Sequence, residues 1–153
     1  MNGTILQVNI SPGGLPKRPV REALLSPLGF EGDAHAHPKI HGGPAKAILL
    51  IPSELTDLLI ARGFPLFYGA LGENLTTQGI DIRSLMPRMR LRCGAAVIET
   101  TQLRRPCNSL DVYGASLRPV IEADPALGGW YASVVIPGHV RGGDPVAVLD
   151  VAV

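Results

Sequence analysis

The stretch Arg90-Leu91-Arg92-Cys93-Gly94-Ala95-Ala96-Val97-Ile98-Glu99-Thr100-Thr101 predicts a β-hairpin. Its two strands would span residues 90–92 and 95–101, with the turn at Cys93-Gly94. Further runs of β-forming residues predict strands on both sides of it, over residues 4–10, 47–51, 130–136 and 146–153. A chain with strands along its whole length belongs to a mostly β fold class.

The composition favours the same class. The 153 residues include 18 glycines and 14 prolines spread throughout, which indicates many short elements and therefore a barrel or a sandwich. A hydrophobic fraction of 46% predicts a folded chain, and the length suits a single domain over residues 1–153. We find no repeat or linker that would divide it.

One helix is predicted after Pro52, with Ser53 as its N-cap and Gly63 at its end. Glu54 and Asp57 favour the helix start, and Leu55, Leu58 and Leu59 would form its apolar face. A second, shorter helix is predicted over residues 116–123, where Pro119 falls in the first turn. The patterns therefore predict a mostly β, α+β fold, a barrel or a sandwich with one or two short helices.

Charge and cysteine content limit the function classes. A net charge of +1 leaves no broad basic face for nucleic acid. The N-terminal residues show no leader peptide, and no apolar run is long enough for a membrane helix. Two cysteines are too few for a disulfide framework, so we expect a cytoplasmic protein that acts on a small molecule.

Three of the four histidines lie in Gly32-Asp33-Ala34-His35-Ala36-His37-Pro38-Lys39-Ile40-His41-Gly42-Gly43-Pro44. Imidazoles at 35, 37 and 41 could bind zinc or iron, because a strand-borne His-x-His pair points both rings to one face. We favour loop histidines that hydrogen-bond to backbone or ligand. A cupin-like metal site remains the alternative, although its glutamate is absent and His139 lacks the required spacing.

Two further segments hold candidate site residues. The glycine-bracketed stretch Gly69-Ala70-Leu71-Gly72-Glu73-Asn74-Leu75-Thr76-Thr77-Gln78-Gly79 is either a ligand-binding loop or a plain surface turn. In Arg104-Arg105-Pro106-Cys107, two guanidinium groups would favour the thiolate, which ligates soft metals or attacks sulfur and carbon. We expect Cys107 to be reactive and Cys93, inside a strand pattern, to be buried filler; a disulfide between them stays open.

These segments, in this order, resemble the MOSC family, named after the C-terminal domain of molybdenum-cofactor sulfurase. The resemblance covers nearly the whole chain and rests on six motifs: Gly32-Asp33-x-His35, His41-Gly42-Gly43-Pro44 with Lys46, Gly72-Glu73-Asn74-Leu75-Thr76, Arg104-x-Pro106-Cys107, Gly129-Trp130-Tyr131, and Gly138-x-Val140-Arg141-x-Gly143-Asp144. Two departures are Met86-Pro87-Arg88, where Gly-Asp is common, and Lys46, where arginine is common. Lysine cannot give arginine's bidentate grip on phosphate.

The resemblance implies a MOSC-type barrel that binds the molybdenum cofactor, with Cys107 as catalytic residue and metal ligand. It also implies cofactor contacts from Asp33, His35, His41, Gly42, Gly43, Lys46, Glu73, Asn74, Thr76, Arg104 and Arg141. The implied activity is reduction of N-hydroxylated or N-oxygenated compounds, fed by an electron-donor protein. An association with pyridoxal phosphate is implied at the level of the family only.

A second hypothesis keeps the fold and changes the role of the thiol. Cys107 would accept sulfur as a persulfide from a cysteine desulfurase and pass it to an acceptor for cofactor or cluster assembly. In that hypothesis the domain carries sulfur and holds no metal.

Overall fold

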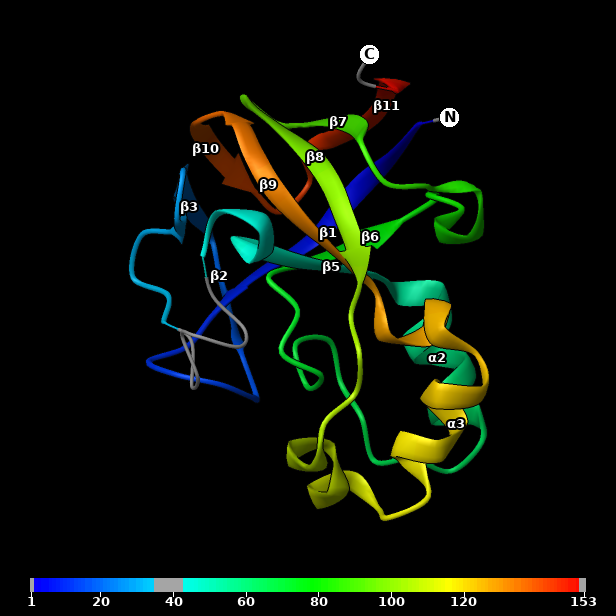
Figure 1. The fold of residues 1–153 in the computed structure, drawn as a ribbon. Helices are drawn as coiled ribbons and strands as arrows, with labels where there is room; N and C mark the ends of the chain where they lie inside the picture. Colours follow the sequence, from blue (N-terminus) through cyan, green and yellow to red (C-terminus); the bar gives the residue numbers. More distant parts are fainter. Residues whose placement is uncertain (1, 35–42, 152–153) are drawn as a thin grey trace.

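The computed structural model describes residues 2–34 and 43–151, and its strands form a closed barrel (Figure 1). The ring runs β1, β11, β7, β8, β9, β5 and β6, and β6 pairs again with β1. The bounds are β1 Asn2–Ile10, β5 Ile48–Pro52, β6 Leu75–Gln78, β7 Met89–Cys93, β8 Ala96–Leu103, β9 Trp130–Ile136 and β11 Pro145–Val151. The barrel predicted from the sequence is confirmed.

Strand β1 links the barrel to its surroundings. Its first half pairs with β11, and its second half pairs with β2, Arg18–Val20. A separate small sheet, in the order β10-β3-β4, consists of Gly138–Arg141, Glu22–Ser26 and Gly29–Phe30. The loop between β1 and β2 returns beside residues 33–34, and this is where the site begins.

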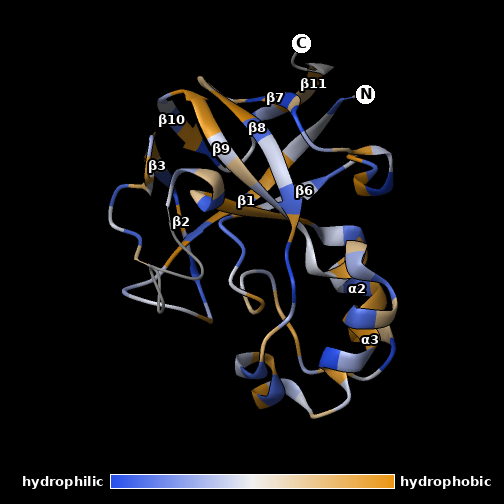
Figure 2. Ribbon diagram, in the orientation of Figure 1, coloured by the Kyte–Doolittle hydropathy of each residue, from blue (hydrophilic) through white to orange (hydrophobic). Residues whose placement is uncertain are grey.

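All paired strands of the barrel are antiparallel except β5 and β6. Parallel neighbours need a crossover connection, which here contains α2, Ser53–Ala61, and the loop that follows it. The end of that loop, residues 69–74, comes back to the barrel at the site. Strand β5 is buried along its whole length and hydrophobic in character, as Figure 2 shows.

Helix α2 differs from its prediction at two residues. Ser53 is the first helical residue and not the N-cap, because Pro52 is still extended (φ −65°, ψ 139°) at the end of β5. Leu58 is 54% exposed, while Thr56 is buried beside Leu55 and Leu59. The predicted end at Gly63 is confirmed by its φ of 97°.

Helix α3, Leu117–Ala123, lies beside α2 at one end of the barrel, drawn at the bottom of Figure 1, and the 3-10 turns are distributed around the barrel. Helix α3 confirms the predicted second helix, and the 3-10 turns are η1 Pro44–Lys46, η2 Ile82–Ser84, η3 Asn108–Tyr113 and η4 Pro125–Gly128. Within the described part of the chain, no helix is long and apolar enough to cross a membrane.

The predicted hairpin is present as β7 and β8, joined through the pair Cys93 and Ala96. Just before it, Arg88 has a φ of 68°, a conformation in which a non-glycine residue is strained. This residue belongs to Met86-Pro87-Arg88, where the chain departs from the family pattern. Arg88 keeps its place through a backbone hydrogen bond from its N–H to the carbonyl of Thr100 in β8.

Candidate functional site at the end of the barrel

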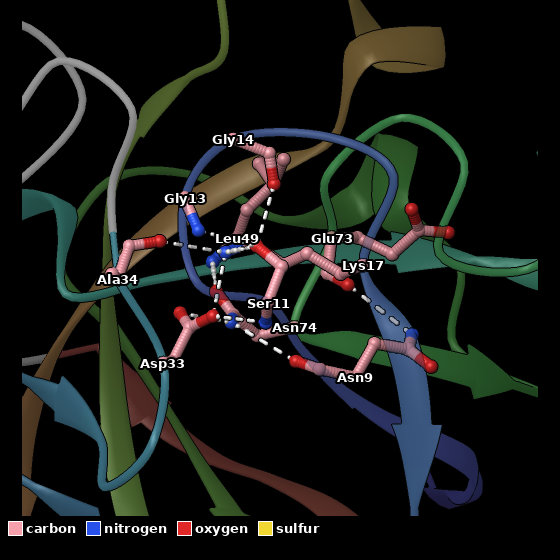
Figure 3. Close-up of polar contacts among 10 residues, drawn as sticks. All are labelled: Asn9, Ser11, Gly13, Gly14, Lys17, Asp33, Ala34, Leu49, Glu73 and Asn74. Atoms are coloured by element: carbon pink, nitrogen blue, oxygen red, sulfur yellow. Dashed lines mark hydrogen bonds and ion pairs between the residues drawn. The ribbon is translucent and has the colours of Figure 1, made fainter.

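A buried ion pair fixes one wall of the site. The Lys17 ammonium lies 2.6 Å from Oδ1 of Asp33, and both side chains are almost fully buried, at 6% and 2% exposed. The same ammonium donates to Oγ of Ser11 and to the carbonyl of Ala34, at 3.3 and 3.2 Å (Figure 3). An ammonium has three hydrogens, so Lys17 uses its full donor capacity inside the protein.

Asn74 completes this group. Its Nδ2 donates to Oδ2 of Asp33 at 2.8 Å and to the carbonyl of Asn9, and its Oδ1 accepts from the backbone N–H of Leu49. Oδ1 of Asp33 also accepts the backbone N–H of Ser11 at 2.9 Å. We call Ser11, Lys17, Asp33 and Asn74 the Lys17 cluster; its contacts join β1, β5 and the loop before β6 (Figure 3).

The Lys17 cluster holds the loop between β1 and β2 against the barrel. Ser11 Oγ donates to the carbonyl of Gly14 at 2.8 Å, which folds the loop over its own start. At the other end, Gly69 approaches Lys17 closely, because the Lys17 N–H donates to the Gly69 carbonyl and a Cβ on Gly69 would lie 2.2 Å from the Lys17 carbonyl oxygen. Only glycine suits Gly69, which also has a φ of 100°.

Beside this wall is a cavity of about 330 Å³, near the lower end of the range for small-molecule sites. Segments distant in the sequence meet around it. Its lining consists of Gly13, Gly14, Leu15, Lys17, Lys46, Leu49, Leu71, Gly72, Asn74, Arg104, Cys107, Ser109, Val112 and Tyr131. Among the described residues, the lining therefore combines a thiol with three cationic side chains and no carboxylate.

The two thiols have opposite environments. Cys107 is half-buried and lines the cavity, and its Sγ lies 2.8 Å from Oγ of Ser109. Cys93, at the end of β7, is fully buried, and burial raises the pKa of its thiol to about 12. Both are free, so no disulfide joins them. The prediction that Cys93 is core filler is confirmed, and Cys107 is the thiol that a ligand can reach.

Arg104 and Glu73 lie deeper at the same end of the barrel. Arg104 is 5% exposed. Its Nη1 donates to the carbonyl of Leu71 at 2.7 Å, while its buried Nε has no hydrogen-bond partner in the part of the chain that the structure describes. Glu73 is fully buried, and burial raises the pKa of its carboxyl to about 7 against the opposing effects of backbone N–H groups, Arg104 and Thr76. Its Oε1 is also buried and has no hydrogen-bond partner within residues 2–34 and 43–151. This part of the site retains unused polar capacity.

Lys46 lies at the end of the turn η1 and lines the cavity. Its Nζ lies over the ring of Tyr131, 5.4 Å from the centroid. Tyr131 and its neighbour Trp130 are both 6% exposed, in agreement with their predicted place in the core and rim of the barrel. A cation held over an aromatic ring keeps its charge at a defined position.

The structure brings some predicted site residues to the cavity and keeps others away. Lys46, Asn74, Arg104 and Cys107 line it, whereas Asp33, Glu73 and Thr76 are held behind it by internal contacts. Gly43 precedes η1 and does not line the cavity. Arg141 is exposed on β10, where its Nη2 lies 3.3 Å from Oε2 of Glu22. The predictions for His35, His37, His41 and Gly42 fall on residues outside those that the structure describes.

Sequence reasoning missed Lys17 and Ser109. Lys17 follows a Pro/Gly-rich turn, and its partner Asp33 lies 16 residues further on, so no local pattern marked the pair. Ser109 lies two residues after Cys107, and the 3-10 turn η3 brings the two side chains into contact.

Fold and site together define a class of protein: a closed β-barrel with a single ligand-accessible thiol among cationic side chains. Residues 37–147 match the MOSC domain family. The chain is 36% identical over 136 residues to Protein YiiM of Escherichia coli strain K12, covering 84% of this chain and 60% of YiiM. It is 32% identical over 142 residues to the uncharacterized protein YflK of Bacillus subtilis strain 168, covering 90% and 63%.

The solved structures agree. The crystal structure of YiiM from E. coli superposes with a TM-score of 0.78 at 29% identity, covering 97% of this chain and 70% of the other. A crystal structure described only as a hypothetical protein gives 0.79 at 29% identity, with 97% and 66% covered. The chain belongs to the MOSC family. It spans a little over half of the length of the curated relatives, at 60% and 63%.

Proposed function

We propose that this protein binds the molybdenum cofactor in the cavity at Cys107 and reduces N-hydroxylated or N-oxygenated compounds. The observation that carries the proposal is the position of the Cys107 sulfur, on the wall of a cavity that it shares with Lys46 and Arg104. A thiolate suits a soft, redox-active metal, and cationic side chains suit the phosphate of a pterin.

The donor set fits a metal that arrives with ligands of its own. Among the residues that the structure describes, no group of three or more His, Cys, Asp or Glu side chains could hold a bare ion. Cys107 supplies one soft ligand, and a pterin cofactor carries the further sulfur ligands that such a site lacks. A single thiolate beside cationic side chains therefore suits a metal that is held mainly by its cofactor.

The phosphate would be held on the cationic side. Arg104 lines the cavity, and a charge-assisted hydrogen bond from its guanidinium would hold a phosphate oxygen. Lys46 would add a point charge on the cavity lining, without the bidentate geometry of arginine. Asp33 and Asn74 would support the cavity wall from behind, because their polar atoms are used inside the Lys17 cluster.

When bound, the metal supplies the two-electron redox chemistry. In the proposed net reaction the N–O bond of the substrate breaks and its oxygen leaves as water. The nitrogen is reduced by two electrons from a reduced electron-donor protein, and two protons are taken up. This chain would bind the reactants, orient them and exclude bulk water from the cavity.

The test is the molybdenum content of protein made in a host that synthesises the cofactor. Wild type should retain molybdenum near one atom per chain, and Cys107→Ser should lose nearly all of it. Cys93→Ala is the matched control, because it removes a thiol of similar size that does not line the cavity and should retain the metal. Equal molybdenum in wild type and Cys107→Ser would refute the assignment.

The same accessible sulfur also favours the persulfide carrier as a second candidate. A carrier exposed to a cysteine desulfurase and cysteine would gain one sulfur atom on Cys107, which intact-mass measurement detects. Wild type without molybdenum that gains this sulfur, while Cys107→Ser does not, would favour the carrier over the reductase.

A further inference from the structure

A second hollow adjoins the cavity. This groove has a volume of about 820 Å³ and shares Lys46 and Arg104 with the cavity, so the two side chains stand between them. Arg105, exposed directly after Arg104, lines the groove and not the cavity. A ligand in the groove would therefore lie next to whatever occupies the cavity.

The groove combines apolar and cationic surfaces. Its apolar lining consists of Leu103, Pro106 and Ile121. Its cationic lining consists of Lys46, Arg104 and Arg105, and among the described residues Glu122 is the carboxylate that lines it. An apolar wall with an excess of cationic groups selects an organic body that carries an anion. Because guanidinium groups match the geometry of phosphate, a phosphate monoester suits this lining.

The cavity and the groove differ in volume, and this difference favours different occupants. At about 330 Å³ the cavity has the space of roughly eleven water molecules, which one pterin-sized group would fill. The second reactant then needs other space within reach of Cys107. The groove is larger and is separated from the cavity only by the two shared side chains.

We propose that this groove is the substrate site, and that it selects phosphorylated substrates by holding their phosphate at Arg105. The inference rests on the proposed function, in which the N–O bond at the other end of the substrate is reduced. In this arrangement the apolar body lies along Leu103 and Pro106, and the reacting end points toward the cavity. Free and phosphorylated forms of one substrate would then differ in affinity.

The experiment compares a nucleoside 5′-monophosphate with its nucleoside by calorimetric titration, on protein with and without cofactor. Wild type should bind the monophosphate about tenfold more tightly, and Arg105→Ala should lose about fivefold to tenfold of that preference, as expected for one charge-assisted contact. Arg92→Ala is the matched control, since Arg92 is exposed on β7 and lines neither hollow. It should bind as wild type does.

Three results would overturn the inference: no preference for the monophosphate, an equal loss in Arg92→Ala, or a loss in Lys46→Ala without one in Arg105→Ala. The last result would show that Arg105 does not hold the phosphate. Arg105 is exposed, so its variant should fold, which an unchanged Tm confirms. Cys107→Ser separates the two proposals, because it should lose molybdenum and keep the phosphate preference.

Discussion

The two walls of the cavity are built on different principles. In the Lys17 cluster, the Lys17 ammonium and the Asn74 amide use all their donors inside the protein, and both Asp33 carboxylate oxygens accept hydrogen bonds. On the opposite side, the buried Nε of Arg104 has no hydrogen-bond partner among the described residues, and the Cys107 thiol contacts the Ser109 hydroxyl. One wall is saturated, and the other retains capacity for a ligand.

This difference separates residues that contact a ligand from residues that hold the cavity wall in place. The sequence motifs alone did not distinguish these two roles. Polar residues in a binding motif either touch the ligand or hold in place the residues that do. A side chain whose hydrogen bonds are all internal gains little from a ligand, whereas a buried unpaired donor gains much. We therefore assign positioning to Asp33 and Asn74, and ligand contact to Arg104 and Cys107.

The largest effect should come from breaking the saturated wall. Lys17→Met should lower the free energy of unfolding by about 3–5 kcal/mol, because it leaves Asp33 buried without its counter-charge. Urea unfolding measures this loss. The matched control is Arg83→Met, because Arg83 pairs with Asp124 at 2.7 Å but both side chains are 42–50% exposed, and its loss should stay below about 1 kcal/mol.

A loss below about 1 kcal/mol in Lys17→Met would contradict the assignment of this wall as structural. Lys17→Met combined with Asp33→Leu gives a further check. Because both charges are then absent, the double variant should be more stable than Lys17→Met alone. Additive losses would mean that the two side chains do not act as a pair.

A somewhat smaller effect should appear at Glu73, behind the ligand-binding wall. Its folded-state pKa of about 7 lies above the ordinary 4.5, so the folded protein holds a proton that the unfolded chain has released. Its contribution to stability is therefore present below about pH 4.5 and is lost as the pH rises toward 7. Glu73→Gln removes this dependence and should gain up to about 3 kcal/mol on wild type between pH 4 and pH 8.

Urea unfolding of both proteins across that pH range measures the difference. The reverse slope, with wild type gaining on Glu73→Gln as the pH rises, would show that the buried carboxyl is stabilised as an anion by Arg104. Gln keeps the size and one acceptor of Glu, so the variant is expected to fold.

The smallest effect on stability is expected at Lys46, on the open side. Lys46→Ala should change the free energy of unfolding by less than about 1 kcal/mol, because its ring contact with Tyr131 is a modest interaction on the cavity lining. Its molybdenum content should fall several-fold all the same. Unfolding measured beside elemental analysis tests both parts, and a large stability loss would place Lys46 with the structural wall.

Periodicity and turn residues were enough to predict the strands, because β9 and the β7–β8 hairpin are local features. They left a barrel and a sandwich open, and only the family resemblance implied the barrel. The cap of α2 was wrong because β5 runs directly into the helix, which the sequence does not reveal. For the site, the chemistry of Cys107 and Arg104 was visible in one segment. Lys17 was not, since only the folded chain brings it to Asp33, and Arg141 was expected near the site but lies exposed on β10.

Because the two cysteines differ in burial, their reactivity with a thiol reagent would report local opening of the barrel. Cys93 is sealed in the core with its pKa raised to about 12, so in the native protein a thiol reagent at neutral pH should modify Cys107 alone. Opening of the barrel at β7 would release a second reactive site. The ratio of doubly to singly tagged chains would then report how often that strand leaves its neighbours, without any engineered label.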